Sequence, residues 1–521
     1  LILIPEKNIN SIFTINKIDS LLNFNDEEFA TIRKQIIKKN YGIPITIKKR
    51  LIWEEVAIIS ENIPELPGVH IEMALVRYYT SNTTSHIIGY VSKPSILDKK
   101  KSKLLTLPSS RVGKSGVELV LDKYIRGKPG KQKIEVNAHG RTVKVLRKLD
   151  GLPGSDIHLT ISKTMQEYIH NRLGDERAGV VLLKIPNGEI LASVSTPSFD
   201  PNAFNSELSK KEWDKIKNNS FKPLFNRASM GLYPPGSVFK LVVAIAALEN
   251  NLIDPYKKHF CSGGFEFGNQ IFHCWRKNGH GYVNCMEAIS QSCDIYFYDL
   301  ALKVGIDKIM PIAKELGLGA SYEKEILQSA KGLLPDKKWK RKTFNQAWSK
   351  SETIVAGIGQ GYILSSPLQL AVLISRIASG GLMINPNIIK LIDGKNNYKP
   401  DIKKINISQN SLSIIKEGLF KVVNNQRGTA YGSRIINKHN IMAGKTGTSP
   451  VRRITMSERE KGILKNEELP LEQRDHALFV GFAPYNNPKY AISVVVEHGG
   501  SGSKSAAPVA RDILKKVNEL L

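Results

Sequence analysis

The chain has 521 residues, more than one ordinary hydrophobic core supports, so we expect two to three domains. Hydrophobic residues make up 41% of it and charged residues 24%, as in soluble globular proteins, and no apolar run approaches the roughly 18 residues of a membrane span. The net charge of +27 comes from lysines spread over the whole length, which indicates a solvated surface or attraction to anionic lipid headgroups and disfavours a nucleic-acid site. Because the first residue is Leu1 and not Met, we expect a start segment, with any membrane anchor, before it.

The N-terminal part of the chain predicts a small α/β module followed by an extended, sheet-rich platform. Asn25 precedes acidic residues and an apolar period of helical spacing, which predicts a helix to about residue 39. A second short helix is predicted over residues 53–63. Glycine-punctuated or alternating patterns typical of strands follow at residues 86–91, 113–118 and 131–147, the last around His139 and Gly140.

A turn cluster at residues 152–155 marks the boundary that we predict between an N-terminal domain, residues 1–155, and a C-terminal domain, residues 156–521. The expected strands of the C-terminal domain are 157–161, 178–186, 190–195, 477–482 and 490–497, and its expected helices include 163–173 and 507–521. Because both ends of this domain supply strands, we expect one sheet assembled from both ends, with helices inserted between: an α+β, multidomain chain.

Ser237 opens an unusual helix. Two prolines and a glycine precede it, and from Val238 to Leu248 every residue except Lys240 is apolar. A helix that is apolar all round is buried, and burial disfavours the charged form of a lysine. The spacing of three residues places Ser237 and Lys240 on one helix face, within hydrogen-bond reach, so Lys240 could take the serine proton. The alternative is a helix-start serine with a lysine that extends to solvent.

Two downstream motifs supply what a serine nucleophile needs besides a base, namely a proton route to the leaving group and a clamp for substrate charge. Ser292 and Asp294 follow a helical pattern, and Lys445 begins a Lys-Thr-Gly-Thr run at the edge of a predicted strand. Each motif alone is weak, since Ser-x-x-Lys arises about twice by chance in such a chain. The order Ser-x-x-Lys, Ser-x-Asp, Lys-Thr-Gly makes the combination specific.

Three similar segments are set aside because of their context. Ser501 to Lys504 repeats Ser-x-x-Lys in a glycine- and serine-rich stretch that we expect to be a flexible loop. Lys114 to Gly116 imitates the third motif but precedes Ser237. A phosphate-binding loop ending at Lys445 fails, because His439 stands where its first glycine is required.

All four cysteines lie between residues 261 and 293. A tetrahedral zinc ion could take four ligands from this segment, namely Cys261, Cys274, His280 and Cys293. Cys285, His259 and His273 compete for those places. In an oxidising compartment, two disulfides with three possible pairings explain the same cysteines. Spacing alone leaves both interpretations open.

The ordered motifs resemble the three signature motifs of penicillin-binding proteins and serine β-lactamases. Further stretches extend the resemblance over essentially the whole chain and narrow it to the elongation-type class B enzymes, the penicillin-binding protein 2 subgroup: Tyr233 to Ser237, Cys274 to Gly281, Gly357 to Tyr362, Arg474 to His476 and Gly481 to Tyr485. An aspartate at 294, where many relatives carry asparagine, fits that subgroup. The resemblance implies a penicillin-binding transpeptidase (serine β-lactamase-like) fold with a central antiparallel sheet flanked by helices, preceded by a non-catalytic pedestal and head domain of the dimerisation type.

By resemblance, the reaction is peptidoglycan D,D-transpeptidation during cell-wall elongation and shape maintenance. Ser237 attacks the penultimate carbonyl of a D-Ala-D-Ala stem peptide while Lys240 takes its proton, and the backbone N–H groups of Ser237 and Thr448 hold the oxyanion. An amine of a neighbouring stem peptide then resolves the acyl-enzyme. Penicillins imitate the dipeptide and trap the serine.

The remaining roles also come from the resemblance. Ser292 and Lys445 pass a proton to the departing D-Ala, and Asp294 orients this network. The residues implied in substrate binding are Thr446, Gly447 and Thr448, with the threonines on the carboxylate and the glycine allowing close approach to the strand edge.

The resemblance also implies cofactor, partners and location. It favours a structural zinc at the Cys261, Cys274, His280 and Cys293 set over disulfides, with no organic cofactor. The implied partners are the stem peptide and its lipid-linked precursor, β-lactam antibiotics, a membrane glycan polymerase of the elongation machinery and its scaffold proteins, and no nucleic acid. The implied location is the periplasmic face of the bacterial inner membrane.

Three alternatives differ in function class. A β-lactamase would hydrolyse its acyl-enzyme, but such enzymes normally have one domain. A scaffold would use the N-terminal platform to activate a membrane glycan polymerase, with catalysis secondary. A β-lactam-sensing receptor would not need such a platform.

Overall fold

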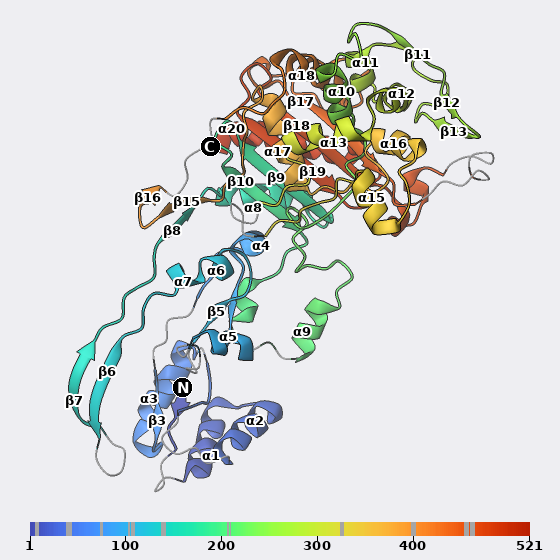
Figure 1. Cartoon of the computed structure of the whole chain (residues 1–521). Helices are drawn as coiled ribbons and strands as arrows, with labels where there is room; N and C mark the ends of the chain where they lie inside the picture. Colours follow the sequence, from blue (N-terminus) through green and yellow to red (C-terminus); the bar gives the residue numbers. More distant parts are fainter. Residues whose placement is uncertain are drawn as a thin grey trace. The chain divides into compact units, whose positions relative to one another are not determined.

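The computed structural model describes residues 1–5, 10–37, 44–49, 51–72, 77–102, 105, 110–136, 142–205, 208, 210–322, 328–396, 403–452, 458 and 464–520. The chain forms two compact units (Figure 1). One comprises Leu1–Tyr79, Gly127–Pro153 and Asn202–Glu207, and the other Thr80–Arg126, Gly154–Pro201 and Leu208–Leu521. The division that we predict at residues 155 and 156 stays a prediction. None of the helices in the described ranges combines the length and apolar character needed to cross a bilayer.

The smaller unit packs helices against a short antiparallel sheet in the order β2-β1-β3. Its core is aliphatic, with Ile15, Ile18 and Ile59 fully buried. The two helices expected near residues 25–39 and 53–63 are confirmed as α2 and α3. The elements of this core are β1 (Ile2–Leu3), α1 (Ser11–Leu22), α2 (Asp26–Ile37), β2 (Ile45–Thr46), α3 (Trp53–Asn62) and β3 (Val69–His70).

A two-stranded antiparallel ribbon, β6 (Lys131–Val136) and β7 (Thr142–Leu149), also belongs to this unit and confirms the strand pair expected over residues 131–147. His139 and Gly140, which the prediction placed at its centre, lie outside the described residues.

The strand predictions at residues 86–91 and 113–118 are largely wrong. Each segment contributes a two-residue strand, β4 (Val91–Ser92) or β5 (Val112–Gly113), beside a short helix, α4 (Ser85–Ile88) or α6 (Gly116–Val120). Gly89 and Gly116 mark a close approach of two backbones rather than strand ends. Both have positive φ, and a Cβ on Gly89 would lie 1.9 Å from the carbonyl oxygen of Ser115. The same region holds α5 (Ile96–Lys101) and α7 (Asp122–Ile125).

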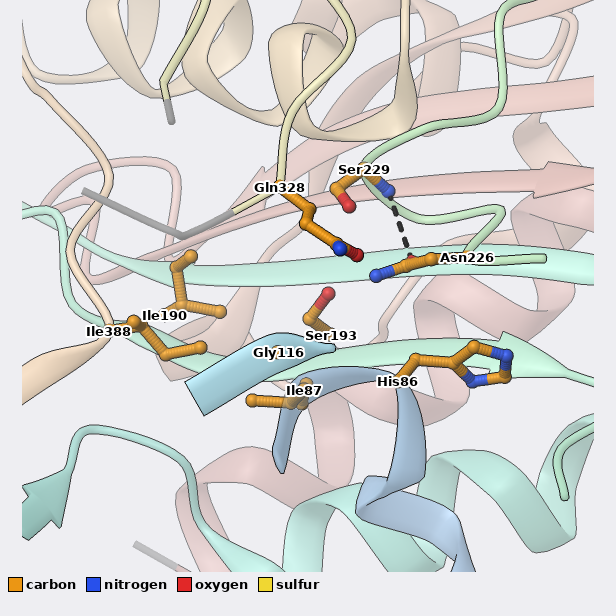
Figure 2. Close-up of a pocket in the computed structure, with 9 residues that line it drawn as sticks. All are labelled: His86, Ile87, Gly116, Ile190, Ser193, Asn226, Ser229, Gln328 and Ile388. Carbon is orange, nitrogen blue, oxygen red and sulfur yellow. Dashed lines mark hydrogen bonds between the residues drawn. The ribbon is translucent and has the colours of Figure 1, made fainter. Parts of the chain in front are cut away.

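A small internal cavity of about 20 Å³ lies beside α4 (Figure 2). His86 and Ser193 line it, as does Asn226, whose side chain accepts a hydrogen bond from the Ser229 N–H at 3.3 Å. The Nε2 atom of the His86 imidazole lies 2.7 Å from the Pro223 carbonyl oxygen. A space of this size holds about one water molecule, which indicates a structural rather than a catalytic cavity.

The central sheet of the larger unit has the antiparallel order β10-β9-β19-β18-β17. It joins an N-terminal hairpin to strands from the end of the chain, as the sequence predicts (Figure 1). Among the described strands, β17 pairs with β18 alone, so its outer edge is open to a substrate. The bounds are β9 (Ala178–Lys184), β10 (Ile190–Thr196), β17 (Ala443–Ser449), β18 (His476–Ala483) and β19 (Tyr490–Val496).

Helices cover both faces of this sheet. The helix expected at 163–173 is confirmed as α8 (Lys163–Leu173), and the closing helix as α20 (Ala507–Leu520); the two pack together on one face. All residues of α17 (Pro367–Ala378) are buried, and it packs on β9, β18 and β19. The Ser501 to Lys504 segment, expected as a flexible loop, instead begins a π-helical turn, Gly502–Ala506, that runs into α20.

A helical layer with small hairpins completes the unit. The expected strand at 157–161 is β8 (Ile157–Leu159), which pairs with β15 (Ile389–Ile392). The helices are α9 (Lys210–Lys217), α10 (Lys240–Glu249), α11 (Cys285–Ser290), α12 (Asp294–Val304), α13 (Ile306–Glu315), α15 (Lys337–Phe344), α16 (Lys350–Gly357) and α18 (Gln409–Asn424). The small strands are β11 (His259–Cys261), β12 (Gly264–Phe267), β13 (Gln270–His273), β14 (Gly281–Val283) and β16 (Lys395–Asn396).

Candidate active site

Ser237 lies on a 3₁₀ turn, Gly236–Val238, that leads into α10. Gly236 fixes this turn: its φ is +53°, its N–H donates to the Gly359 carbonyl at 3.0 Å, and a Cβ there would lie 2.5 Å from the Thr448 carbonyl. Only glycine fits between the two backbones. The turn therefore packs directly on the end of β17, and Ser237, half-buried, lies beside the strand edge.

Lys240 is fully buried at the first turn of α10. Its amine donates to the Asp294 carboxylate at 2.7 Å, the Ser292 carbonyl at 2.9 Å and the Ser292 hydroxyl at 3.2 Å. Within the described part of the chain, the Ser237 hydroxyl makes no hydrogen bond, so the direct contact with Lys240 expected from the sequence is not made in this conformation. Asp294 opposes the burial penalty on the ammonium form.

Ser292 occupies a backbone conformation that is costly for a residue with a side chain, with φ of +55°. Its N–H donates to the Ile289 carbonyl at 3.2 Å. Its own carbonyl accepts from Lys240 and from the Trp275 indole, the latter at 3.1 Å. This conformation turns both oxygens of Ser292 towards the lysine.

Asp294 begins α12, where the helix dipole favours a negative charge. One carboxylate oxygen pairs with Lys240, and the other accepts from the backbone N–H of Trp275 at 2.8 Å. Both oxygens are thereby oriented, and the carboxylate cannot rotate without losing a contact.

Lys445, on β17, is the second fully buried lysine of the site. Burial lowers the pKa of its amine well below the usual range, and the nearby charge of Lys240 lowers it further, while Asp294 opposes both. The amine donates to the Thr446 carbonyl at 3.0 Å. The lowered pKa favours the neutral form of the Lys445 amine.

The rest of β17 presents the groups expected to bind a substrate. The Thr446 hydroxyl lies 2.7 Å from the Thr429 hydroxyl, and Thr448 is half-buried. A Cβ on Gly447 would lie 3.1 Å from the Pro235 carbonyl, so the strand and the nucleophile turn approach closely here. The structure thus brings together all three motifs, from α10, the start of α12 and β17.

The cysteine segment forms one compact cluster. Single donor atoms of Cys261, Cys274, His280 and Cys293 all lie within 4.8 Å of one another, and all four residues are buried. The Cys274 and Cys261 sulfurs lie 3.5 Å and 3.6 Å from His280 Nδ1. Zinc bonds of ~2.3 Å to sulfur and ~2.0 Å to nitrogen, at the tetrahedral angle, place the two atoms about 3.5 Å apart. The donor set and its spacing therefore fit zinc.

The competing ligands lie elsewhere. All four cysteines are free in the structure, and burial raises the pKa of the Cys285 thiol to about 12, which suits a buried neutral thiol rather than a ligand. His259 and His273 are outside the set of close donors.

Trp275 is a functional residue that sequence reasoning missed. It follows Cys274 directly, and its two N–H groups hold Asp294 and the Ser292 carbonyl. The cluster is therefore continuous with the Ser-x-Asp motif through one residue. The stretch that begins at Cys274 drew attention to this region. However, the position of Trp275 next to a candidate metal ligand does not reveal that it donates a hydrogen bond to Asp294.

Family models and curated relatives both match this chain to penicillin-binding proteins. Residues 178–515 match the model of the "Penicillin binding protein transpeptidase domain", and residues 1–159 that of the "Penicillin-binding Protein dimerisation domain". Peptidoglycan D,D-transpeptidase MrdA of Haemophilus influenzae is 32% identical over 99% of this chain and 80% of its own length.

Solved structures agree. Penicillin-binding protein 2 of Helicobacter pylori, in complex with MreC, has a TM-score of 0.86 and 29% identity over 100% of this chain and 94% of its own. A chain from a structure of a peptidoglycan synthase complex that coordinates polymerization and crosslinking has a TM-score of 0.75 and 26% identity, over 98% of this chain and 85% of its own.

Lys445→Met is expected to raise the midpoint of thermal unfolding, by more at pH 7 than at pH 10. Because the folded-state pKa of this lysine is depressed, the folded chain binds fewer protons than the unfolded chain between that pKa and the ordinary value of about 10.4. The lysine thus costs the wild type more stability as the pH falls through this window. Calorimetry at both pH values measures the difference, with the exposed Lys338→Met as control. A gain that is independent of pH would contradict the depressed pKa.

Proposed function

This chain belongs to the penicillin-binding protein transpeptidases, as a serine acyl-transfer peptidoglycan D,D-transpeptidase, and we propose that Ser237 is its nucleophile. The observation that supports this most strongly is the placement of Ser237 between a buried lysine three residues on and the open edge of β17. We assign it to the cross-linking of stem peptides during wall elongation, with β-lactams as inhibitors.

The first chemical step is acyl transfer to Ser237. Its hydroxyl oxygen bonds to the penultimate D-Ala carbonyl carbon, and Lys240, which must be in its neutral form for this step, takes the serine proton. Asp294, 2.7 Å from the amine, stabilises the positive charge that forms on Lys240 during this transfer. The backbone N–H groups of Ser237 and Thr448 hold the oxyanion, since the turn and the end of β17 pack together.

Expulsion of D-Ala requires a proton on its amine. Ser292 is suited to relay it, because its hydroxyl lies 3.2 Å from the Lys240 amine. Lys445, whose lowered pKa favours a neutral amine, adjoins the same hydroxyl-rich cleft and completes the relay. An amine of a second stem peptide then attacks the ester, forms the cross-link and releases Ser237.

Substrate recognition belongs to β17. Thr446 and Thr448 bind the terminal carboxylate, and Gly447 lets the peptide lie against the strand edge. The contact between the Thr446 and Thr429 hydroxyls orients the first of these groups.

Replacing Ser237 tests the central assignment. Ser237→Ala removes the only atom that can form the ester, so labelling by a fluorescent penicillin should disappear, with the folded state intact by circular dichroism. Wild-type label should be released slowly, as from a transpeptidase. A labelled variant would refute the nucleophile, and rapid turnover by wild type would favour a β-lactamase.

We further propose that Cys261, Cys274, His280 and Cys293 bind a structural zinc, with no organic cofactor. Bound there, the ion would fix Cys274 and hence Trp275, whose N–H groups hold Asp294 and Ser292. The metal thus takes no part in acyl transfer but orders the second motif.

Metal analysis tests this site. Wild type should contain about one zinc per chain, and Cys274→Ser should lose it, with a lower midpoint of thermal unfolding and slower penicillin labelling. Cys285→Ser, which removes the cysteine outside the cluster, should keep the metal. A zinc-free wild type with two disulfides by mass spectrometry would rule the site out.

Partners and location extend the proposal. The H. pylori relative is solved with MreC, and another similar chain lies in a peptidoglycan synthase complex. In this chain, the smaller unit exposes large apolar side chains, with Phe13 at 60% and Trp53 at 79%, which suits a protein interface. We propose that this unit binds a scaffold protein and that the enzyme works with a membrane glycan polymerase at the periplasmic face of the inner membrane, where its lipid-linked precursor is delivered.

A further inference from the structure

The Arg474 to His476 stretch has no role in the acyl transfer described above, although it meets the active site. His476 is the first residue of β18 and pairs with Ser449, the last residue of β17. Thr448, which supplies an oxyanion N–H in the proposed mechanism, is one residue away along β17. His476 therefore lies at the end of the substrate-binding strand.

The imidazole of His476 joins two segments that flank the cleft. Its Nδ1 accepts a hydrogen bond from the His498 N–H at 3.0 Å, so the ring proton is on Nε2. The ring also meets the Tyr233 ring edge-on, with centroids 5.5 Å apart, and the His498 ring at 4.7 Å. His476 thus contacts both the loop after β19 and the approach to the nucleophile turn.

Tyr233 transmits this contact towards Ser237, four residues on. Its hydroxyl donates to Glu497 at 2.8 Å, and Glu497 pairs with Arg227 at 3.0 Å. Its backbone exchanges two hydrogen bonds with Ser365, at 3.0 Å and 2.9 Å. The tyrosine is fixed at both ends, so displacement of its ring would be passed to the turn through Pro234 and Pro235, which restrict the intervening backbone.

The loop after β19 leads into the π-helical turn Gly502–Ala506, which packs against β17. The Asp475 carbonyl accepts from the Gly500 N–H at 2.8 Å, and a Cβ on Gly502 would lie 2.3 Å from the Gly447 carbonyl. This loop therefore supports the middle of the substrate-binding strand, and its start at His498 is held by His476.

We propose that His476 is a positioning residue for acyl transfer, which sets the spacing between the Ser237 turn and the Thr448 end of β17 by holding Tyr233 and His498 together. The inference rests on the proposed function of Ser237. His476 itself touches no substrate. It acts on the two N–H groups that bind the oxyanion, whose energy of interaction depends steeply on their spacing.

The position requires a neutral ring. The pKa of His476 is lowered to about 4: burial is the largest cause, the facing His498 and Arg177 act in the same direction, and Glu497 and Glu472 oppose them. Protonation of Nδ1 would remove the acceptor for the His498 N–H. At neutral pH the acceptor is therefore permanently available.

Three variants of the full chain test this role: His476→Ala, His476→Asn and His86→Ala. Asparagine offers an acceptor near the position of Nδ1, whereas alanine offers none. His86 serves as a control, because burial lowers its pKa to about 4 as well, but it lies beside the small cavity of α4 (Figure 2). Stopped-flow labelling with fluorescent penicillin separates the dissociation constant of the first complex from the acylation rate constant.

His476→Ala should lower the acylation rate constant at least tenfold and change the dissociation constant less than twofold, since the threonine side chains still bind the carboxylate. His476→Asn should recover most of the rate. His86→Ala should lower the thermal midpoint without lowering the acylation rate constant.

Equal losses in His476→Ala and His476→Asn would overturn the positioning role, as would a loss confined to the dissociation constant. A matching rate loss in His86→Ala would also overturn it, because general destabilisation would then explain the effect. Failure of wild type to be labelled would refute Ser237 itself and this inference with it, so the two failures are distinguishable in one assay.

Discussion

The buried ion pair between Lys240 and Asp294 is the interaction on which the site depends. Lys240 is buried within an apolar helix, where an unpaired ammonium would be costly. Burial lowers the pKa of the second buried lysine, Lys445, and the nearby charge of Lys240 lowers it further. One carboxylate serves this pair of amines. Its position at the start of α12 and its contact with Trp275 therefore decide how charge is distributed in the cleft. The proposed reaction uses this arrangement, because the Lys240 amine that takes the Ser237 proton is already hydrogen-bonded to the Asp294 carboxylate.

The Asp294 carboxylate is held by the segment that contains the cysteine cluster, which is not part of the central sheet. The chain passes from Cys274 to Trp275, and Trp275 donates to both Asp294 and Ser292, while Cys293 separates these two residues in the sequence. The four-donor cluster and the Ser-x-Asp motif therefore form one unit. Ser292 needs such support, because its positive φ is unfavourable and must be offset by its surroundings. On the other side of the cleft, glycines at 236 and 447 allow backbones to meet without side chains between them.

Sequence patterns predicted the regular elements of the larger unit well, since the periods of α8, β9, β10, β18 and β19 are strong and local. The motif residues were predicted from the order of three motifs that are weak alone, and the four cluster donors from the resemblance, since spacing alone left disulfides open. Wrong predictions arose where a contact distant in sequence decides the conformation. Gly89 looked like a strand end but meets Ser115 across the chain. The helix spacing places Lys240 within reach of Ser237, but it could not reveal that Asp294, 54 positions away, accepts a hydrogen bond from the Lys240 amine. The sequence assigned no role to Trp275 or His476, because the stretches that contain them do not reveal which residues their side chains contact in the fold.

The central claim is that one serine, at the junction of the α10 turn and β17, forms the covalent intermediate. Peptide mapping by mass spectrometry after reaction with benzylpenicillin tests it most directly. We expect a single adduct, of the mass of the intact drug, on the peptide that contains Ser237. An adduct on the peptide that contains Ser292 or on that with Ser501 and Ser503, or a folded wild type without any adduct, would contradict the assignment of this cleft as the acyl-transfer site.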